Sequence, residues 1–187
     1  MTLFYTFHLN LFIFFNQHSD LDFLNRWLML NQLSLNISKS KFIIIGSSQH
    51  LSKLDSISLT ADDKQIEEIN SLTYLGAVIN KQLTWQDHIE YISSKINKKI
   101  GLSKCIRACL PLEARLLFFN SYILPIFGYA DIIWGDRGNK TLMSQLQILR
   151  NKAARVILDL PYDASGTESL NKQLKWKLLS RRRAEHR

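Results

Sequence analysis

The chain has 187 residues, of which 46% are hydrophobic, and a formal net charge of +8 at pH 7. This composition is ordinary for a globular protein with a core. Two cysteines exclude a disulfide framework and, by themselves, a zinc site. Cys105 and Cys109 are predicted to be small, semi-buried residues on one helix face. The positive charge indicates a polyanionic partner, with nucleic acid the first candidate and an anionic membrane the second.

The charge is unevenly distributed along the chain. Residues 1–94 contain 6 Lys and Arg and 9 Asp and Glu, a net charge of −3, whereas residues 95–187 contain 18 and 7, a net charge of +11. Any surface for a polyanion is therefore predicted to lie in the C-terminal half.

The N-terminal segment 3–15 is apolar, but no Lys or Arg precedes it, since the first is Arg26. It is also too short to span a bilayer. A strand or buried segment is predicted there, rather than a signal peptide or membrane anchor. The chain is expected to be intracellular, in the nucleus or cytoplasm, with no membrane partner, and not secreted.

The first half is predicted to combine one helix with strands. A helix is predicted over 18–34, with Leu21, Leu24 and Leu28 on one face. The segment 33–46 alternates and ends in a β-branched run, which indicates a strand. Residues 57–69 are predicted to form a hairpin. Leu72–Ile79 is predicted to be one further strand with Gly76 inside it, where a glycine often marks a bulge or a close approach.

The second half is predicted to be helical. Ile89, Ile92, Ile96 and Ile100 form an apolar stripe on a helix that starts at Thr84. Further helices are predicted from Pro111, bent or ended by Pro125, then over 141–158 and as a basic helix over 167–184. Their inward residues are predicted to include Leu112, Leu116, Phe119 and Ile123, then Leu142, Leu146, Leu149, Ala153 and Val156. The expected fold is α+β, a small antiparallel sheet with one helix followed by a helical bundle, with a boundary near 82–86.

Two short stretches imitate a polymerase active site. Such a site needs carboxylates that hold two Mg²⁺ ions about 3.5–4 Å apart. The stretch LTADDKQ contains Asp62 and Asp63, but the following Glu67 and Glu68 favour an exposed acidic turn. FGYADIIWG has one aspartate, Asp131, among apolar neighbours, and is predicted to be a buried connection. No other catalytic motif is present, and no metal site is predicted.

The basic C-terminal half indicates a function more strongly than any of these possible catalytic motifs. Its lysines lie off the apolar stripe, so the helix has one core face and one positive face, as in modules that follow a phosphate backbone without reading sequence. A solvated face kept basic for solubility is the alternative. Nucleic-acid contacts are assigned to Lys95, Lys98, Lys99, Lys104, Arg150 and Lys152. The run Arg181–Arg183 is interpreted as an unstructured tail or a nuclear-import patch.

Four segments in order resemble the reverse transcriptase of non-LTR (LINE-type) retrotransposons, the jockey-like branch above all. They are LNRWLMLNQLSLNISKSKFIIIG, SLTYLGAVINKQLTWQDHIEYISSKINKKIGLSKCIR, SYILPIFGYADIIWG and LQILRNKAARVIL, and the resemblance covers about 20–165. It implies that residues 1–82 are a partial palm and that 83–187 are a helical, basic thumb, which holds the template–primer duplex.

The resemblance also implies roles for single residues. The palm pattern W-x-x-x-N-x-L-x-x-N followed by K-[ST]-K matches Trp27, Asn31, Leu33, Asn36, Lys39, Ser40 and Lys41. Lys39 is implied to assist the leaving pyrophosphate. Tyr74, Leu75 and Gly76 resemble the primer-grip hairpin, and the motif that opens the thumb matches Leu83, Thr84, Trp85, His88 and Ile89.

The resemblance places the family's catalytic aspartates just before the position of Met1. The chain is therefore expected to be a template–primer-binding fragment of an RNA-directed DNA polymerase that is inactive alone. Mg²⁺ is the cofactor of the full-length family, with none expected in this chain, and the expected partner is an RNA–DNA or DNA duplex bound without sequence preference. A stand-alone nucleic-acid-binding module or a non-functional relic of the element is the alternative.

Overall fold

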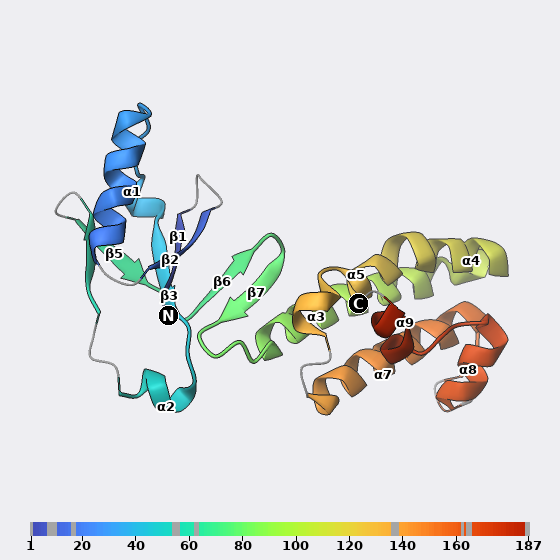
Figure 1. The fold of residues 1–187 in the computed structure, drawn as a ribbon. Helices are drawn as coiled ribbons and strands as arrows, with labels where there is room; N and C mark the ends of the chain where they lie inside the picture. Colours follow the sequence, from blue (N-terminus) through green and yellow to red (C-terminus); the bar gives the residue numbers. More distant parts are fainter. Residues whose placement is uncertain are drawn as a thin grey trace. The chain divides into compact units, whose positions relative to one another are not determined.

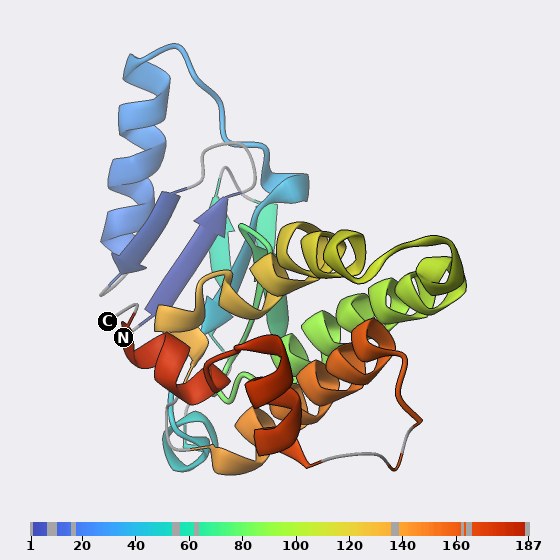
Figure 2. The same ribbon diagram turned by 90° about the vertical axis from the view of Figure 1, so that its right-hand side faces the viewer.

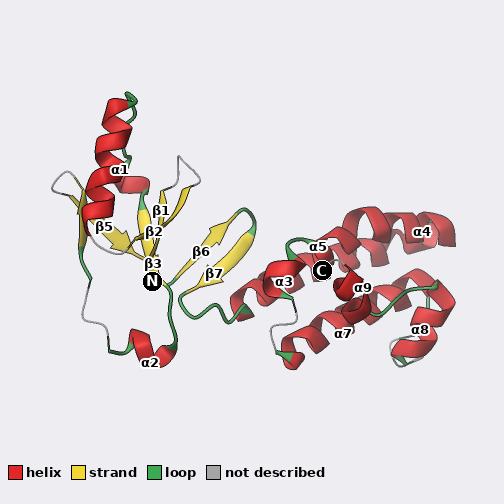
Figure 3. Cartoon of the chain, viewed as in Figure 1, coloured by secondary structure: helices red, strands yellow, loops and turns green. Residues whose placement is uncertain are grey.

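The computed structural model describes residues 2–6, 11–15, 18–53, 57–61, 64–135, 139–161, 163 and 166–185. The chain divides into two compact units, Met1–Trp85 and Gln86–Arg187 (Figure 1), called here the sheet unit and the helical unit. Figure 3 shows strands in the first and helices throughout the second. Among the described helices, none has the length and apolarity needed to cross a bilayer.

The sheet unit contains a five-stranded sheet and a separate two-stranded sheet. The larger sheet has the order β2-β1-β3-β5-β4, with β1 Thr2–Thr6, β2 Leu11–Phe15, β3 Lys41–Ile44, β4 Leu59–Ala61 and β5 Lys64–Glu68. The smaller pairs β6 Ser71–Tyr74 with β7 Ala77–Asn80. The α+β class is confirmed. One pairing differs from the predicted antiparallel sheet: β3 and β5 run parallel, with Lys41 opposite Glu67.

Helix α1, His18–Leu30, covers the core of the larger sheet. Buried residues of this core include Leu21 on α1, Phe42 on β3 and Ile66 on β5. The helix ends before the predicted residue 34 because Gln32 has a left-handed φ of 57°. The opposite face of α1 is apolar but exposed, with Phe23 at 72% and Leu30 at 79% of their accessible surface.

Two short helices complete the sheet unit. The strand predicted over 33–46 is shorter than expected, because a 3-10 turn, η1 Ile37–Lys39, precedes β3. The Asn36 side chain accepts a hydrogen bond from the Lys39 backbone N–H at 3.2 Å and so caps this turn. Helix α2, Ser48–Leu51, follows β3 in the segment beyond the predicted strand.

The predicted single strand 72–79 is wrong, because the segment is a tight hairpin. Tyr74 pairs with Ala77, which leaves Leu75 and Gly76 as a two-residue turn with φ of 45° and 81°. A type I′ turn requires positive φ at both central positions. Gly76 is therefore a turn residue rather than a strand interruption. The leucine before it hid the turn, since asparagine or aspartate is usual at that position.

The helical unit is built around two long helices, α3 Gln86–Ile106 and α7 Lys140–Leu158, which pack side by side (Figure 2). Its other elements are η2 Arg107–Cys109, α4 Leu112–Phe118, η3 Phe119–Ile123, α5 Leu124–Gly128, α6 Asp131–Trp134, α8 Thr167–Leu174 and α9 Leu179–Glu185. The predicted stripe is confirmed, since Ile89, Ile92, Ile96 and Ile100 are all buried. On α7, Leu142, Leu146, Ala153 and Val156 are buried as predicted, and Leu149 is half-buried.

The helix predicted from Pro111 continues past Pro125 by means of a π-helical turn. In η3 the Leu124 N–H donates to the Phe119 carbonyl, one residue further back than in an α-helix. The wide turn precedes Pro125, which has no N–H to donate. Phe119, Ile123 and Phe127 are buried along this segment. The predicted inward position of Leu112 is wrong, because this residue is exposed in the first turn of α4.

The predicted basic helix over 167–184 is two helices, because Lys175 adopts a left-handed φ of 54° and ends α8. The Trp176 ring then stacks on Phe119, with ring centroids 4.4 Å apart. Arg181–Arg183 lie in α9 rather than in an unstructured tail, and Arg183 is buried. The predicted semi-burial of the thiols is also wrong, because Cys105 and Cys109 are both exposed.

Candidate nucleic-acid interface

A cavity of about 410 Å³ lies between α3 and α7, and its polar lining is largely cationic. The cationic residues that line it are Lys104, Arg107, Lys152 and Arg155. Each pair is spaced three residues apart along the chain, a spacing that places helical side chains on one face. Because α3 and α7 pack against each other, the two pairs converge on one groove. Lys104 and Lys152 were predicted as nucleic-acid contacts, whereas Arg107 and Arg155 were missed.

Two contacts hold the sides of this cavity together. The Lys152 ammonium donates to the Asn97 side-chain oxygen at 2.9 Å and so links α7 to α3. Arg107 pairs with Asp159 at 2.8 Å, an ion pair with both side chains partly exposed. Surface pairs of this kind contribute only about 0–1 kcal/mol and exchange readily with other charges. In the sequence, each of the two missed arginines follows a predicted lysine by three residues. This spacing is the sequence signal from which Arg107 and Arg155 could have been predicted.

The other lysines predicted on α3 fall into two environments. Lys95 and Lys98 are exposed, and the Lys95 ammonium lies 4.2 Å from the centroid of the Tyr91 ring. Lys99 is half-buried, and its ammonium donates to the Tyr122 carbonyl at 3.0 Å. The same ammonium lies 3.3 Å from the centroid of the Tyr122 ring. Lys99 therefore joins α3 to η3, while Lys95 and Lys98 point their charge toward solvent.

Arg150 is not an exposed contact, contrary to the prediction. The residue is only 3% exposed, and it lies on the buried side of α7, one turn after Leu146. Its guanidinium donates to the Lys177 carbonyl and lies 4.8 Å from the centroid of the Trp176 ring. Burial, followed by the positive charges of Arg182 and Arg183, lowers the pKa of Arg150 to about 10.

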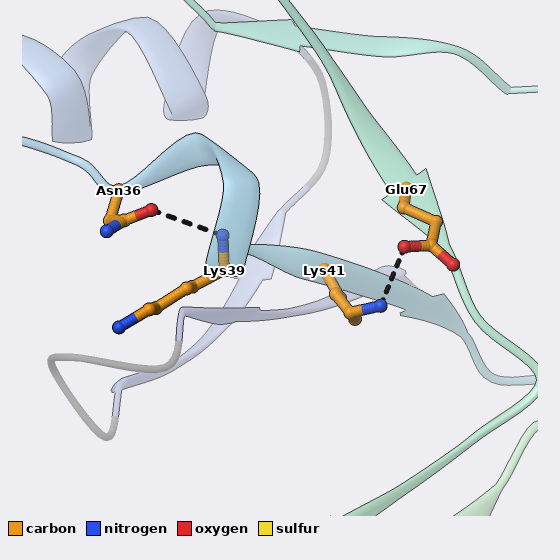
Figure 4. Close-up of polar contacts among 4 residues, drawn as sticks. All are labelled: Asn36, Lys39, Lys41 and Glu67. Atoms are coloured by element: carbon orange, nitrogen blue, oxygen red, sulfur yellow. Dashed lines mark hydrogen bonds and ion pairs between the residues drawn. The ribbon is translucent and has the colours of Figure 1, made fainter.

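The predicted residues of the sheet unit lie at its surface. Lys39 is exposed at the end of η1, and its side chain extends away from the Lys41–Glu67 ion pair, which measures 2.6 Å (Figure 4). Leu75 and Gly76 form the exposed tip of the β6–β7 hairpin, and Tyr74 beside them is half-buried. These positions leave Lys39 and the hairpin tip accessible, without bringing them together in one site.

The motif expected to open the thumb has a structural role before α3. Leu83 and Trp85 have positive φ of 52° and 63°, and the Trp85 side chain is buried. Between them the Thr84 N–H donates to the Asn80 side-chain oxygen at 3.0 Å, and the Asn80 amide donates to the Thr84 hydroxyl at 2.7 Å. This reciprocal pair holds the chain in an unusual conformation where the sheet unit ends.

His88 is fully buried in the first turns of α3. Its ring centroid lies 5.3 Å from that of Trp134 and 6.5 Å from that of Tyr91. Burial, and secondarily the nearby Lys95 charge, lowers the pKa of His88 below its usual value of 6.5. His88 therefore belongs to the core of the helical unit.

The lowered pKa of His88 predicts a stability that depends on pH. Below pH 6.5 the unfolded chain binds a proton that the folded chain excludes, so the free energy of unfolding should fall as the pH falls. The slope should approach about 1.4 kcal/mol per pH unit and level off below the folded-state pKa. Urea unfolding followed at several pH values measures this slope. His88→Gln should flatten it, whereas a steep slope that persists in His88→Gln and disappears in the exposed-residue control His50→Gln would contradict the assignment.

Of the two stretches that imitate a polymerase active site, the structure describes the aspartate of FGYADIIWG. Asp131 is 5% exposed at the start of α6, directly after Ala130, which has a left-handed φ of 54°. Asp62 and Asp63 lie outside the described residues. Within the described part of the chain, no three His, Cys, Asp or Glu side chains are placed to hold a metal ion. The described carboxylates therefore do not fit a pair of Mg²⁺ ions, which needs several carboxylate ligands.

Two curated proteins of Drosophila melanogaster are similar to this chain. The "Probable RNA-directed DNA polymerase from transposon BS" is 26% identical over 105 residues, which is 54% of this chain and 12% of that protein. The "Probable RNA-directed DNA polymerase from transposon X-element" is 24% identical over 117 residues, 61% of this chain and 13% of that protein. No family model and no solved structure matches the chain. Over 54–61% of its length, this chain is therefore related to RNA-directed DNA polymerases of transposons.

Proposed function

We propose that this chain is a template–primer-binding part of a jockey-like, non-LTR retrotransposon reverse transcriptase. In this proposal the sheet unit is part of the palm and the helical unit is the thumb. The observation that carries it is the convergence of Lys104, Arg107, Lys152 and Arg155 on one cavity, in a chain related to transposon polymerases. The ligand is an RNA–DNA or DNA duplex, bound through its phosphates in the nucleus or cytoplasm.

The charge of the helical unit supports binding without sequence preference. Residues 86–187 contain 18 Lys and Arg and nine Asp and Glu. Lysines that contact phosphates release condensed counterions, and this release gives affinity without base recognition. The proposed contacts are Lys95, Lys98, Lys104 and Lys152, with Arg107 and Arg155 beside them. The competing explanation, a surface kept basic for solubility, predicts no preference for the cavity lysines over other lysines.

An exposed apolar face of the sheet unit supports the proposal that this chain is part of a larger polymerase. The outer face of α1 exposes Phe23 and Leu30, which are large apolar side chains about two turns apart. Clustered exposed apolar residues usually mark a surface that another structure covers. In a larger palm this face has a partner. Lys39 remains the residue proposed to assist the leaving pyrophosphate, and its exposed side chain leaves the ammonium group accessible for this role.

Duplex binding measured over a range of salt concentrations tests the proposal. Fluorescence anisotropy with a labelled RNA–DNA hybrid should show affinity that falls steeply with salt, by a slope of about 0.9 per phosphate contact. The double substitution Lys104→Gln and Lys152→Gln should reduce the slope by about 2 and weaken binding by at least about tenfold at low salt. The control Lys172→Gln removes the same charge from the exposed face of α8, outside this cavity.

Two outcomes of the binding experiment contradict the proposal. If Lys172→Gln weakens binding as much as the cavity substitutions, the charge acts only in bulk and no interface exists at α3 and α7. If the chain does not bind the hybrid at low salt, the thumb assignment is wrong. We also propose that the chain does not extend a primer by itself, and a primer-extension assay in Mg²⁺ tests this part of the proposal. Extension by the 187-residue chain would contradict an inactive fragment, whereas hybrid binding without extension is the expected result.

A further inference from the structure

We propose that a second cavity of the helical unit, around Arg150 and Arg182, binds a phosphate monoester or inorganic phosphate. This cavity, of about 540 Å³, lies among α4, η3, α7, the segment after α8, and α9. The cationic residues that line it are Arg150, Lys175, Lys177 and Arg182. The inference goes beyond the proposed function, because none of these residues lines the cavity between α3 and α7.

Arg150 is the centre of this site because it is a buried cation whose hydrogen-bonding capacity is only partly used. Its Nη1 donates to the Lys177 carbonyl, but its buried Nε has no acceptor among the described residues. Neither Arg150 nor Arg182 forms a salt bridge with a described residue. Buried guanidinium groups are normally paired with an anion or fully hydrogen-bonded. The Arg150 guanidinium thus carries a positive charge that no described carboxylate neutralises, and an anion in the cavity would neutralise it.

The charges around the cavity are not balanced by the protein. Glu185 is the acidic residue among its described lining residues, and its carboxylate already pairs with Lys177 at 2.6 Å. The positive charges of Arg182 and Arg183 repel that of Arg150, which adds to the effect of burial in lowering its pKa. Like charges held together in this way are stabilised when an anion binds between them. The site therefore favours a ligand with two negative charges.

The lining also indicates which part of a ligand enters. The Trp176 ring stacks on Phe119 at 4.4 Å and lies 4.8 Å from the Arg150 guanidinium. Because these neighbours already occupy the ring, Trp176 does not serve as a platform for a nucleobase. Recognition then rests on the phosphate group, and arginine forks suit phosphate oxygens. A terminal monoester or free phosphate carries nearly two charges at pH 7, whereas a phosphodiester carries one.

Calorimetric titration of the whole chain tests the inference. The probes are inorganic phosphate and two short oligonucleotides of one sequence, one with a 5′-phosphate and one with a 5′-hydroxyl, all at matched ionic strength. We expect saturable binding of phosphate and competition by phosphate against the 5′-phosphorylated strand only. Arg182→Gln should weaken phosphate binding about tenfold or more, since a hydrogen bond to a charged group is lost. Lys172→Gln, outside the cavity, should leave binding within about twofold of the parent chain.

The melting temperature distinguishes a binding site from a structural cation. In phosphate-free buffer, Arg182→Gln should melt at the same temperature as the parent chain or higher, because a like charge near Arg150 is removed. A lower melting temperature would identify Arg182 as structural and would overturn the proposal. Equal affinity for the two oligonucleotides, or no response to phosphate, would overturn it as well. Tighter binding of the 5′-phosphorylated strand than of free phosphate would assign the site to strand ends, and the reverse order to free phosphate.

The two proposals can fail independently. The Lys104→Gln and Lys152→Gln chain should bind phosphate like the parent, because neither lysine lines this second cavity. Arg182→Gln should leave the salt slope for the internal phosphates of a long hybrid unchanged. If both variants lost hybrid binding and phosphate binding, neither ligand would be bound by its own cavity, and both proposals would be wrong.

Discussion

Trp134→Ala is expected to lower the free energy of unfolding of the helical unit by about 3–5 kcal/mol. Trp134 is 1% exposed and lies among the largest fully buried side chains of the described chain. Its indole N–H donates to the Tyr129 carbonyl at 2.8 Å, and the Arg183 guanidinium lies 5.1 Å from its ring centroid. Truncation removes the buried ring, leaves a cavity beside His88 and removes the hydrogen bond that the Trp134 indole donates to the Tyr129 carbonyl.

Urea unfolding followed by far-UV circular dichroism measures this loss. Trp134→Phe keeps a ring but removes the hydrogen bond, so it should cost about 1–2 kcal/mol and separate the two contributions. The matched control is Trp27→Ala, which truncates a half-exposed tryptophan of α1. The control should change the stability of the helical unit by less than about 0.5 kcal/mol. A loss below about 1 kcal/mol for Trp134→Ala would show that this ring is not part of the core.

Gly135→Ala is expected to destabilise the same region by about 2–3 kcal/mol through overpacking. A Cβ built on Gly135 would lie 2.4 Å from the Asp131 carbonyl oxygen and 3.2 Å from the Arg183 Cδ. The Gly135 N–H donates to that same carbonyl at 2.7 Å and ends α6. The backbone must therefore shift to admit a methyl group, which weakens this hydrogen bond.

The control for this prediction is the same change at a glycine with open surroundings. A Cβ on Gly101, inside α3, would have no described atom within 4 Å. Gly101→Ala should therefore stabilise the helical unit by about 0.5–1 kcal/mol, the usual difference between these residues inside a helix. Chemical unfolding of the two variants side by side should give shifts of opposite sign. Shifts of the same sign would contradict the steric explanation.

The elements that sequence predicts correctly are those fixed by long apolar periodicity. The isoleucines of α3 repeat at helical spacing over three turns, and burial follows because only one face can meet α7. The pairing of β4 with β5 confirms the hairpin predicted over 57–69, with Leu59 opposite Ile66. Such patterns suffice to predict burial, because whether each residue is buried depends on its spacing along the element rather than on a distant contact.

The errors occur where a distant contact decides the local structure. The helix break at Lys175 places the Trp176 ring on Phe119, which lies 57 positions earlier in the chain. The sequence near Lys175 contains no glycine or proline that predicts this break. The burial of Arg150 depends on the carbonyl of Lys177 and on Trp176. A cation in a basic stretch is predicted to be exposed, because sequence alone does not reveal a neighbour that accepts its hydrogen bonds.

The stretch FGYADIIWG shows the same limit in another form. Its single aspartate was predicted to lie in a buried connection, and Asp131 is indeed buried, but Ile132 and Ile133 are exposed. The left-handed Ala130 turns the following short helix so that Asp131 and Trp134 face inward. The prediction was therefore wrong for Ile132 and Ile133, because backbone direction rather than hydrophobicity sets which side of a four-residue helix is covered.

Two exposed thiols, Cys105 near the end of α3 and Cys109 in η2, make this part of the helical unit open to labelling. Cys105 directly follows Lys104, and Cys109 lies two residues after Arg107, so both flank residues that line the cavity between α3 and α7. A maleimide fluorophore on either sulfur would report on the approach of a polyanion without replacing any cation. The same thiols make the purified chain prone to intermolecular cross-linking in air, so it needs a reductant until labelling.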